Sequence, residues 1–249
     1  MRRLFFILVV FVPMNVSLAQ NIVECKKMFA EYITSLNEYE LPVEGKNYFV
    51  HITTSTFPNK TAPGYKATSY SSENIDVKMI ISKGKMYYYS TYINFYQDNK
   101  DVFTVVHPIK LILWRRLSQE KQQKPAQNVP ADPMALLRKQ VFAELIMSAC
   151  NDVVLFDKKV KQLIMIPSRK MKEEFNIQKI TYWFNPKEKK IEKQETEYTA
   201  NYPVIRQEMI YHEFSTNYKG DVANSAINNV YDSRKKLLPI YKNYSVKFQ

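Results

Sequence analysis

The sequence predicts an α+β fold of mostly antiparallel strands, in one strongly curved sheet covered by two or three helices. Short stretches of alternating apolar and polar residues, separated by polar turns, follow one another along most of the chain. Only two stretches have clear helical spacing, and the connections between strands are too short for parallel crossovers. No internal repeat or linker divides the chain, so residues 20–249 are expected to form a single β-rich domain.

The first 19 residues have the pattern of a signal peptide. Arg2-Arg3 precedes an apolar run from Leu4 to Val12, and Ser17-Leu18-Ala19 has the small-residue pattern of a cleavage site. An N-terminal membrane anchor is the alternative, but the run is too short to span a bilayer. We therefore expect cleavage between Ala19 and Gln20, export to the periplasm, and a mature chain that is not an integral membrane protein.

The first helix and the first strand come next. Apolar residues recur at helical spacing between Ile22 and Leu36, with charged residues between them. Asn47 to Phe57 is rich in aromatic and β-branched residues, which favours a strand, and Pro58 to Ser72 has the composition of a loop.

A meander is predicted from Asn74 to His107. Lys83-Gly84 has the pattern of a tight hairpin turn, and pairing Ser82 with Lys85 places apolar residues opposite one another. In this register Met79 faces Tyr88, Ile81 faces Met86, and Ile75 faces Tyr92. A polar turn at 98–101 then separates a second long strand from a third at 102–106.

The middle of the chain carries the second helical pattern. Ile109 to Leu117 fits a short helix or a strand, and its Trp114 beside Arg115-Arg116 is either an amphipathic tip that meets lipid or an ordinary buried tryptophan. Ser118 to Ala131 is predicted as a loop. Asp132-Pro133 then begins a helix to Ala149, whose apolar face is Met134, Leu137, Val141, Phe142, Leu145, Ile146 and Ala149.

The last third reads almost entirely as strands. The predicted pairs and single strands are 152–156 with 160–166, 176–184 with 190–199, 204–214, and a final strand at 243–248. Of the two cysteines, Cys25 lies in the first helical pattern and Cys150 ends the second. In an exported protein they are a disulfide candidate, with two buried free thiols as the alternative.

The composition excludes several function classes. The three histidines lack metal-ligand spacing, Gly-x-Ser-x-Gly is absent, and four glycines leave no phosphate-binding loop. We therefore expect no enzyme, no metal and no cofactor, with a glycosidase that uses two facing carboxylates as a distant alternative. The net charge of +12 favours anionic partners, such as lipid headgroups, acidic polysaccharide or acidic proteins, unless the lysines merely solvate turns. Export disfavours nucleic acid.

The order of these elements resembles one known family. A signal peptide, an N-terminal helix, a long antiparallel meander, a mid-chain amphipathic helix and further strands resemble the LolA/LolB-like proteins of bacterial envelopes. The resemblance covers most of residues 20–249 in layout and rests on no short motif. It implies an incomplete β-barrel that wraps apolar helices and holds lipoprotein acyl chains.

We therefore predict a periplasmic, non-enzymatic carrier or chaperone-like protein that binds an apolar ligand, such as lipid or lipoprotein acyl chains. The chain contains 18 Tyr, 14 Phe and 2 Trp residues, and these either fill an ordinary core or line a cavity. The alternative is an envelope interaction or assembly module with a filled core, which binds acidic partners through its basic surface. The predicted cavity residues are Met79, Ile81, Met86, Tyr88, Met134, Leu137, Val141, Phe142, Leu145 and Trp114.

Overall fold

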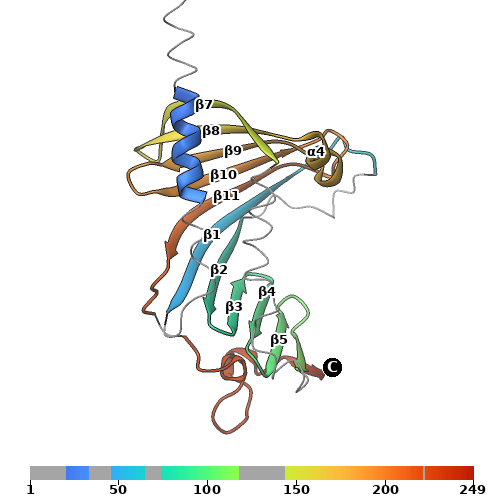
Figure 1. Ribbon diagram of the computed structural model, residues 1–249. Helices are drawn as coiled ribbons and strands as arrows, with labels where there is room; N and C mark the ends of the chain where they lie inside the picture. The colour runs from blue at the N-terminus through green and yellow to red at the C-terminus, as the bar shows by residue number, and fades with distance from the viewer. Residues whose placement is uncertain (1–20, 34–45, 65–73, 118–143, 221) are drawn as a thin grey trace, which may run out of the picture. The chain divides into compact units, whose positions relative to one another are not determined.

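The computed structural model describes residues 21–33, 46–64, 74–117, 144–220 and 222–249 (Figure 1). The predicted signal peptide with its Ala19–Gln20 cleavage site therefore lies outside the described residues. So do the loop predicted at 118–131 and most of the helix predicted after it. In the described part of the chain, no helix is long and apolar enough to cross a membrane.

The described strands form one 12-stranded sheet of mostly antiparallel strands, in the order β12-β6-β5-β4-β3-β2-β1-β11-β10-β9-β8-β7. This confirms the predicted strand-rich, mostly antiparallel architecture. The exception to the antiparallel pairing is β12, which runs parallel to β6. The chain divides into two compact units, and β1 and β11 contribute residues to both. The prediction that 20–249 is a single domain stays a prediction.

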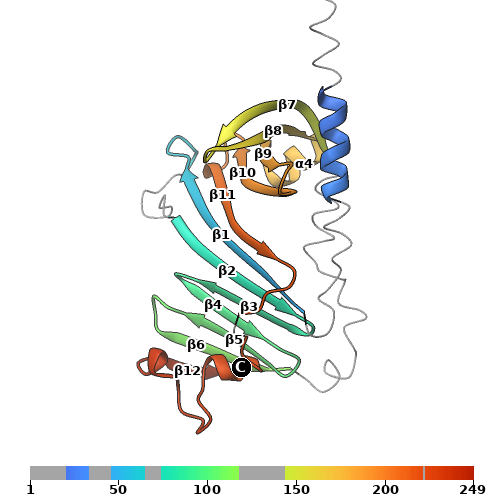
Figure 2. The same cartoon turned by 90° about the vertical axis from the view of Figure 1, so that its left-hand side faces the viewer.

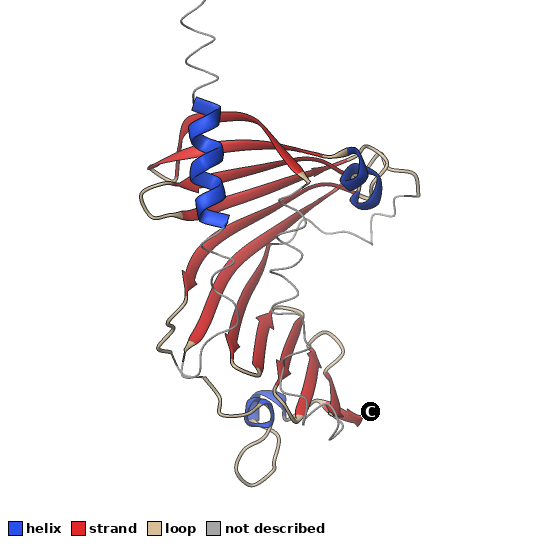
Figure 3. Cartoon of the chain, viewed as in Figure 1, coloured by secondary structure: helices blue, strands red, loops and turns tan. Residues whose placement is uncertain are grey.

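Unit 1 consists of 1–38, 56–72 and 138–208. The N-terminal helix, residues 21–33, lies across its strands (Figures 1 and 3). Phe29 on this helix contacts Tyr182 and Phe184, with ring centroids 5.4 and 6.4 Å apart. The helix thus buries its apolar face on the sheet, as its spacing predicted. The other elements are β7 (Leu145–Leu155), β8 (Lys158–Pro167), α4 (Arg169–Phe175), β9 (Ile177–Asn185) and β10 (Lys190–Tyr198).

The prediction that a helix continues to Ala149 is wrong. Residues 145–149 belong to β7, where Leu145 pairs with Pro167 and Met147 pairs with Met165 of β8. A short apolar run such as Leu-Ile-Met fits the helical and the strand period equally well, so the available partner strand decides. A register shift between Met147 and Ala149 interrupts the alternation that would have indicated a strand.

Unit 2 consists of 39–55, 73–137 and 209–249. Figure 2 shows its strands, with β12 beside β6 at the edge. The short helix η2 packs on β4 and β5. The elements are β1 (Asn47–Pro58), β2 (Asn74–Ser82), β3 (Lys85–Ser90), β4 (Ile93–Gln97), β5 (Asp101–Val106), β6 (Leu111–Arg116), β11 (Val204–Ser215), η2 (Ala226–Asn229), η3 (Pro239–Tyr241) and β12 (Ser245–Phe248).

The predicted register of the first hairpin in unit 2 is confirmed. Ser82 pairs with Lys85, Ile81 with Met86 and Met79 with Tyr88. Gly84 has a φ of 72°, a conformation that glycine adopts without steric cost. The expected pair of Ile75 with Tyr92 does not form, because β3 ends at Ser90.

The long strand predicted after Gly84 is in fact two strands. The Ser90 hydroxyl donates to the carbonyl of Ile93 at 2.8 Å and accepts from the Ile93 amide at 3.1 Å, which closes a tight turn between β3 and β4. The ambiguous stretch at 109–117 forms strand β6 and not a helix.

One face of the unit 2 sheet carries the core of that unit. Aromatic and aliphatic side chains pair across successive strands in the row Phe49, Ile80, Tyr87, Tyr96, Phe103 and Trp114. The C-terminal segment supplies Ala226, Val230 and Tyr241 to the same cluster. We call this side the core face.

Candidate ligand-binding face

The other side of the unit 2 sheet, which we call the second face, is also lined by apolar side chains. Successive residues of a strand point to opposite sides of a sheet, so the neighbours of the core residues fall on this side. Its apolar members include Tyr48, Val50, Met79, Ile81, Met86, Tyr88, Phe95, Val102 and Leu113.

Strand register aligns these side chains in two rows that cross β1 to β6. The first row is Val50, Met79, Tyr88, Phe95, Thr104 and Leu113. The second row is Tyr48, Ile81, Met86, Gln97, Val102 and Arg115. Directly opposed residues on neighbouring strands have Cβ atoms about 5 Å apart, so each row is a continuous strip of side chains.

The two faces differ in burial. Tyr87 and Phe103 of the core face are 0% exposed, whereas Met86 of the second face is 36% exposed. Most other members of the two rows are partly exposed. Continuous apolar surface that stays accessible in a folded chain marks a site for a ligand or a partner. The second face is therefore the candidate binding surface.

Tyrosines of the core face have a structural role. The hydroxyl of Tyr87 donates to the carbonyl of Ala223 at 3.0 Å, and the hydroxyls of Tyr96 and Tyr241 are hydrogen-bonded at 2.9 Å. Burial raises the pKa of both Tyr87 and Tyr96 well above the usual value for tyrosine. These hydroxyls therefore stay protonated and hold the C-terminal segment against the sheet.

The structure brings together some of the predicted cavity residues and separates others. Met79, Ile81, Met86 and Tyr88 share the second face. Trp114 lies on the core face, where its Nε1 donates to Asp101 Oδ1 at 2.7 Å and its ring stacks on Phe103. Leu145 begins β7 in unit 1. The remaining four, Met134, Leu137, Val141 and Phe142, lie outside the described residues.

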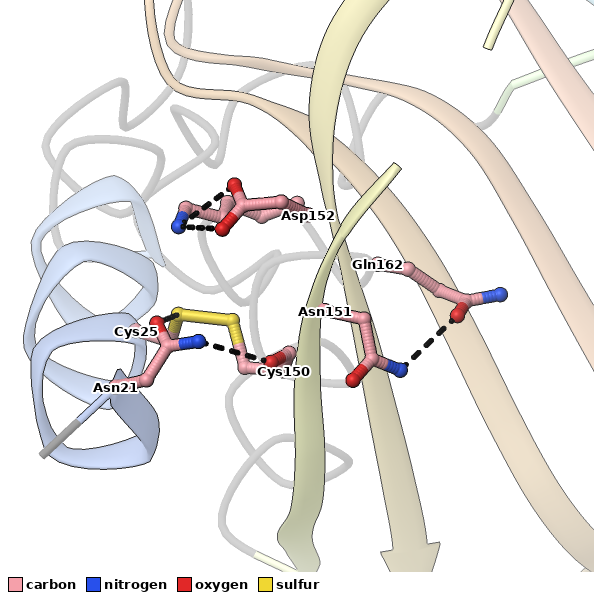
Figure 4. The surroundings of a disulfide bond; sticks show 7 residues. Asn21, Cys25, Cys150, Asn151, Asp152 and Gln162 are labelled. Carbon is pink, nitrogen blue, oxygen red and sulfur yellow. Dashed lines mark hydrogen bonds and ion pairs between the residues drawn. A yellow bond between two sulfur atoms is a disulfide. The ribbon is translucent and has the colours of Figure 1, made fainter. Parts of the chain in front are cut away.

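Cys25 and Cys150 form the predicted disulfide, which joins the N-terminal helix to β7 (Figure 4). Beside it, Asn21 Nδ2 donates to the carbonyl of Cys150 at 3.2 Å. The expectation that Cys150 ends a helix is wrong, because it lies within β7. The bridge fixes the helix over unit 1 by a covalent bond and a hydrogen bond.

Sequence reasoning missed a cluster of His51, Asp76 and His212, whose ligating atoms all lie within 4.8 Å of one another. The three residues come from β1, β2 and β11, which are neighbours in the sheet. No local spacing reveals the cluster. The β1–β2 register pairs Asp76 with Thr53, which is two residues beyond His51 on β1. Asp76 and His51 therefore lie on the same side of the sheet.

No protein-family model matches the sequence, and no curated protein matches it significantly. Solved structures do match. An uncharacterized conserved protein from Thermus thermophilus is 8% identical with a TM-score of 0.42, over 88% of this chain and 99% of its own. A domain of an outer membrane lipoprotein-sorting protein from Vibrio parahaemolyticus is 11% identical with a TM-score of 0.30, over 79% and 95%.

A LolA superfamily protein from Nitrosomonas europaea is 9% identical with a TM-score of 0.28, over 78% of this chain and 94% of its own. The structural matches thus include the LolA/LolB-like group that the order of elements resembles. At these identities and TM-scores the matches do not identify what this chain binds.

Proposed function

We propose that this protein is an exported, non-enzymatic carrier that holds acyl chains of lipid or lipoprotein against the second face. The observation that supports it is the pair of apolar rows, which stay partly exposed while the C-terminal segment fills the core face. In this proposal the sheet is part of an incomplete β-barrel in the periplasm. The predicted cavity residues Met134, Leu137, Val141 and Phe142 lie outside the described residues, and their role stays a prediction.

The side chains of the second face suit a flexible apolar ligand. Met79 and Met86 have unbranched, polarizable side chains that adapt to ligands of different shape. Each methylene removed from water contributes about 0.8 kcal/mol, so about eight methylenes contribute about 6 kcal/mol before the cost of immobilising the chain. Contact of that extent gives reversible binding, which a carrier requires.

The composition of the two rows favours a carrier over an enzyme. Neither row contains a carboxylate, a histidine or a cysteine, which are the usual groups for acid–base or nucleophilic chemistry. The two rows also contain three polar residues, Gln97, Thr104 and Arg115. In this proposal they contact the polar end of a bound lipid.

The first test is the mass of the protein purified after export. Under native conditions we expect an adduct of lipid mass, which is lost when the protein is denatured. A delipidated sample should then take up a fatty acid or a diacylated peptide with saturation at one or a few molecules. A clean protein mass, together with no uptake after incubation with either probe, would reject the carrier.

The variant Met86→Asp tests the location of the site. A carboxylate at this partly exposed position should weaken acyl-chain binding about tenfold or more, because a charge beside hydrocarbon is costly, while the fold is kept. The matched control is Val154→Asp on β7, because Val154 is apolar, in a strand and 69% exposed. Binding should be measured by fluorescence titration with a labelled fatty acid. Equal affinities in the two variants would mean that the binding site does not lie on the second face.

The net charge of +12 supports a second candidate, an interaction module for acidic envelope partners. Salt discriminates between the two. Binding through exposed lysines and arginines should fall steeply as ionic strength rises, because exposed charges are screened over about 8 Å at physiological salt. Acyl-chain binding should change little over the same range.

A further inference from the structure

The cluster of His51, Asp76 and His212 offers two imidazoles and one carboxylate from three adjacent strands of unit 2. His51 and Asp76 are joined by a hydrogen bond between Nε2 and Oδ1 at 2.6 Å. His212 Nε2 lies 2.7 Å from Thr53 Oγ1, and the two imidazole rings are 4.7 Å apart. Two imidazoles and one carboxylate therefore lie close together on one side of the sheet, where they are at least partly exposed.

We infer that these three side chains form a binding site for a divalent transition-metal cation of the Zn²⁺ type. Imidazole nitrogen and carboxylate oxygen are ligands that Zn²⁺, Cu²⁺ and Ni²⁺ accept, and two histidines with one carboxylate is a known Zn²⁺ donor set. Three protein ligands leave a fourth position for water or for a donor atom of a partner.

The geometry requires only small side-chain movements. Ligands of a tetrahedral Zn²⁺ at about 2.0–2.2 Å lie about 3.3 Å from one another. The 2.6 Å contact between His51 and Asp76 must therefore open slightly, while the widest separation of 4.8 Å must close. Both movements are rotations of side chains that are at least partly exposed, so the backbone of the three strands can stay in place.

The alternative to a metal site is a purely structural cluster. The same groups make ordinary cross-strand hydrogen bonds, and those alone would account for their positions. One charge opposes a cation, because Lys78 Nζ lies 4.0 Å from Asp76 Oδ2 and Lys78 is the direct cross-strand partner of His51. The site is therefore expected to have moderate affinity, which Lys78 limits.

The test uses protein purified after export, without a histidine tag, titrated with Zn²⁺ and with Co²⁺. We expect one equivalent to bind, with Co²⁺ giving the intense visible absorption of a four-coordinate site. His51→Gln, Asp76→Asn and His212→Gln should each weaken binding by about tenfold or more. Because the metal would link β11, β1 and β2, it should also raise the unfolding temperature of the unsubstituted chain.

Two further variants make the test specific. His107→Gln is the matched control, because His107 is the remaining histidine and its Nδ1 is hydrogen-bonded to Tyr244 at 2.9 Å, so its loss should leave the affinity unchanged. Lys78→Gln should tighten binding about two- to fivefold by removing the nearby cation. No uptake at millimolar Zn²⁺, or uptake that survives loss of both His51 and His212, would overturn the inference.

Discussion

Replacing Cys25 and Cys150 together by serine is expected to lower the free energy of unfolding by about 3 to 5 kcal/mol. The two residues are 125 positions apart, so the bond closes a very long loop in the unfolded chain. In the chain-entropy account, a longer loop gives a larger stabilisation, although the dependence is logarithmic.

The folded state adds a second reason for the size of this effect. The described part of the N-terminal helix, residues 21–33, would be marginal in water as an isolated segment. It is held on unit 1 by the disulfide and by packing of Phe29 and Tyr32 against Phe184. Without the bond, docking of the helix depends on a few side chains, so part of unit 1 should become exposed.

Urea denaturation measures the change, with circular dichroism for the strands and tryptophan fluorescence for side-chain packing. The unsubstituted protein in the presence of a reductant is the matched control and should unfold at the midpoint of the double variant. A difference of less than about 1 kcal/mol between the oxidised protein and the double variant would contradict the prediction.

The first hairpin of unit 2 shows what the sequence can predict. Alternation and the Lys83-Gly84 turn together determine the register, since a shift of one residue would reverse every side chain. Which face is covered was not predictable. Ile80 and Tyr87 on one side are as apolar as Ile81 and Met86 on the other. The choice depends on Ala226, which packs on the core face and is remote in sequence.

The features that local sequence patterns did not predict have a similar cause. Leu145 to Ala149 forms a strand because β8 pairs with it, and this information lies in another part of the chain. Trp114 joins the core face because Phe103 and Phe248 contact it from β5 and β12. The metal-ligand cluster joins residues that no motif spans. In each case the deciding contact is between strands, and local patterns carry no record of it.

The second large effect is expected at Asp98, which is 5% exposed and lies in the turn between β4 and β5. Its Oδ1 accepts from the amides of Lys100 and Asp101 at 2.7 and 2.8 Å, which shapes the turn. Its Oδ2 accepts from the amide of Ala226 at 2.8 Å, which holds the start of η2 against the sheet. One carboxylate thus fixes two segments that are remote in sequence.

We expect Asp98→Ala to destabilise the protein by about 2 to 4 kcal/mol, because it leaves buried amides without an acceptor. Asp232→Ala is the matched control. Asp232 Oδ1 also accepts two amides, from Arg234 and Lys236, but the residue is exposed, so water can replace it and the cost should stay below about 1 kcal/mol. Hydrogen exchange adds a local reading: the Ala226 amide should lose protection in Asp98→Ala alone. Equal losses of stability in the two variants would mean that turn formation, and not attachment of the C-terminal segment, is what Asp98 contributes.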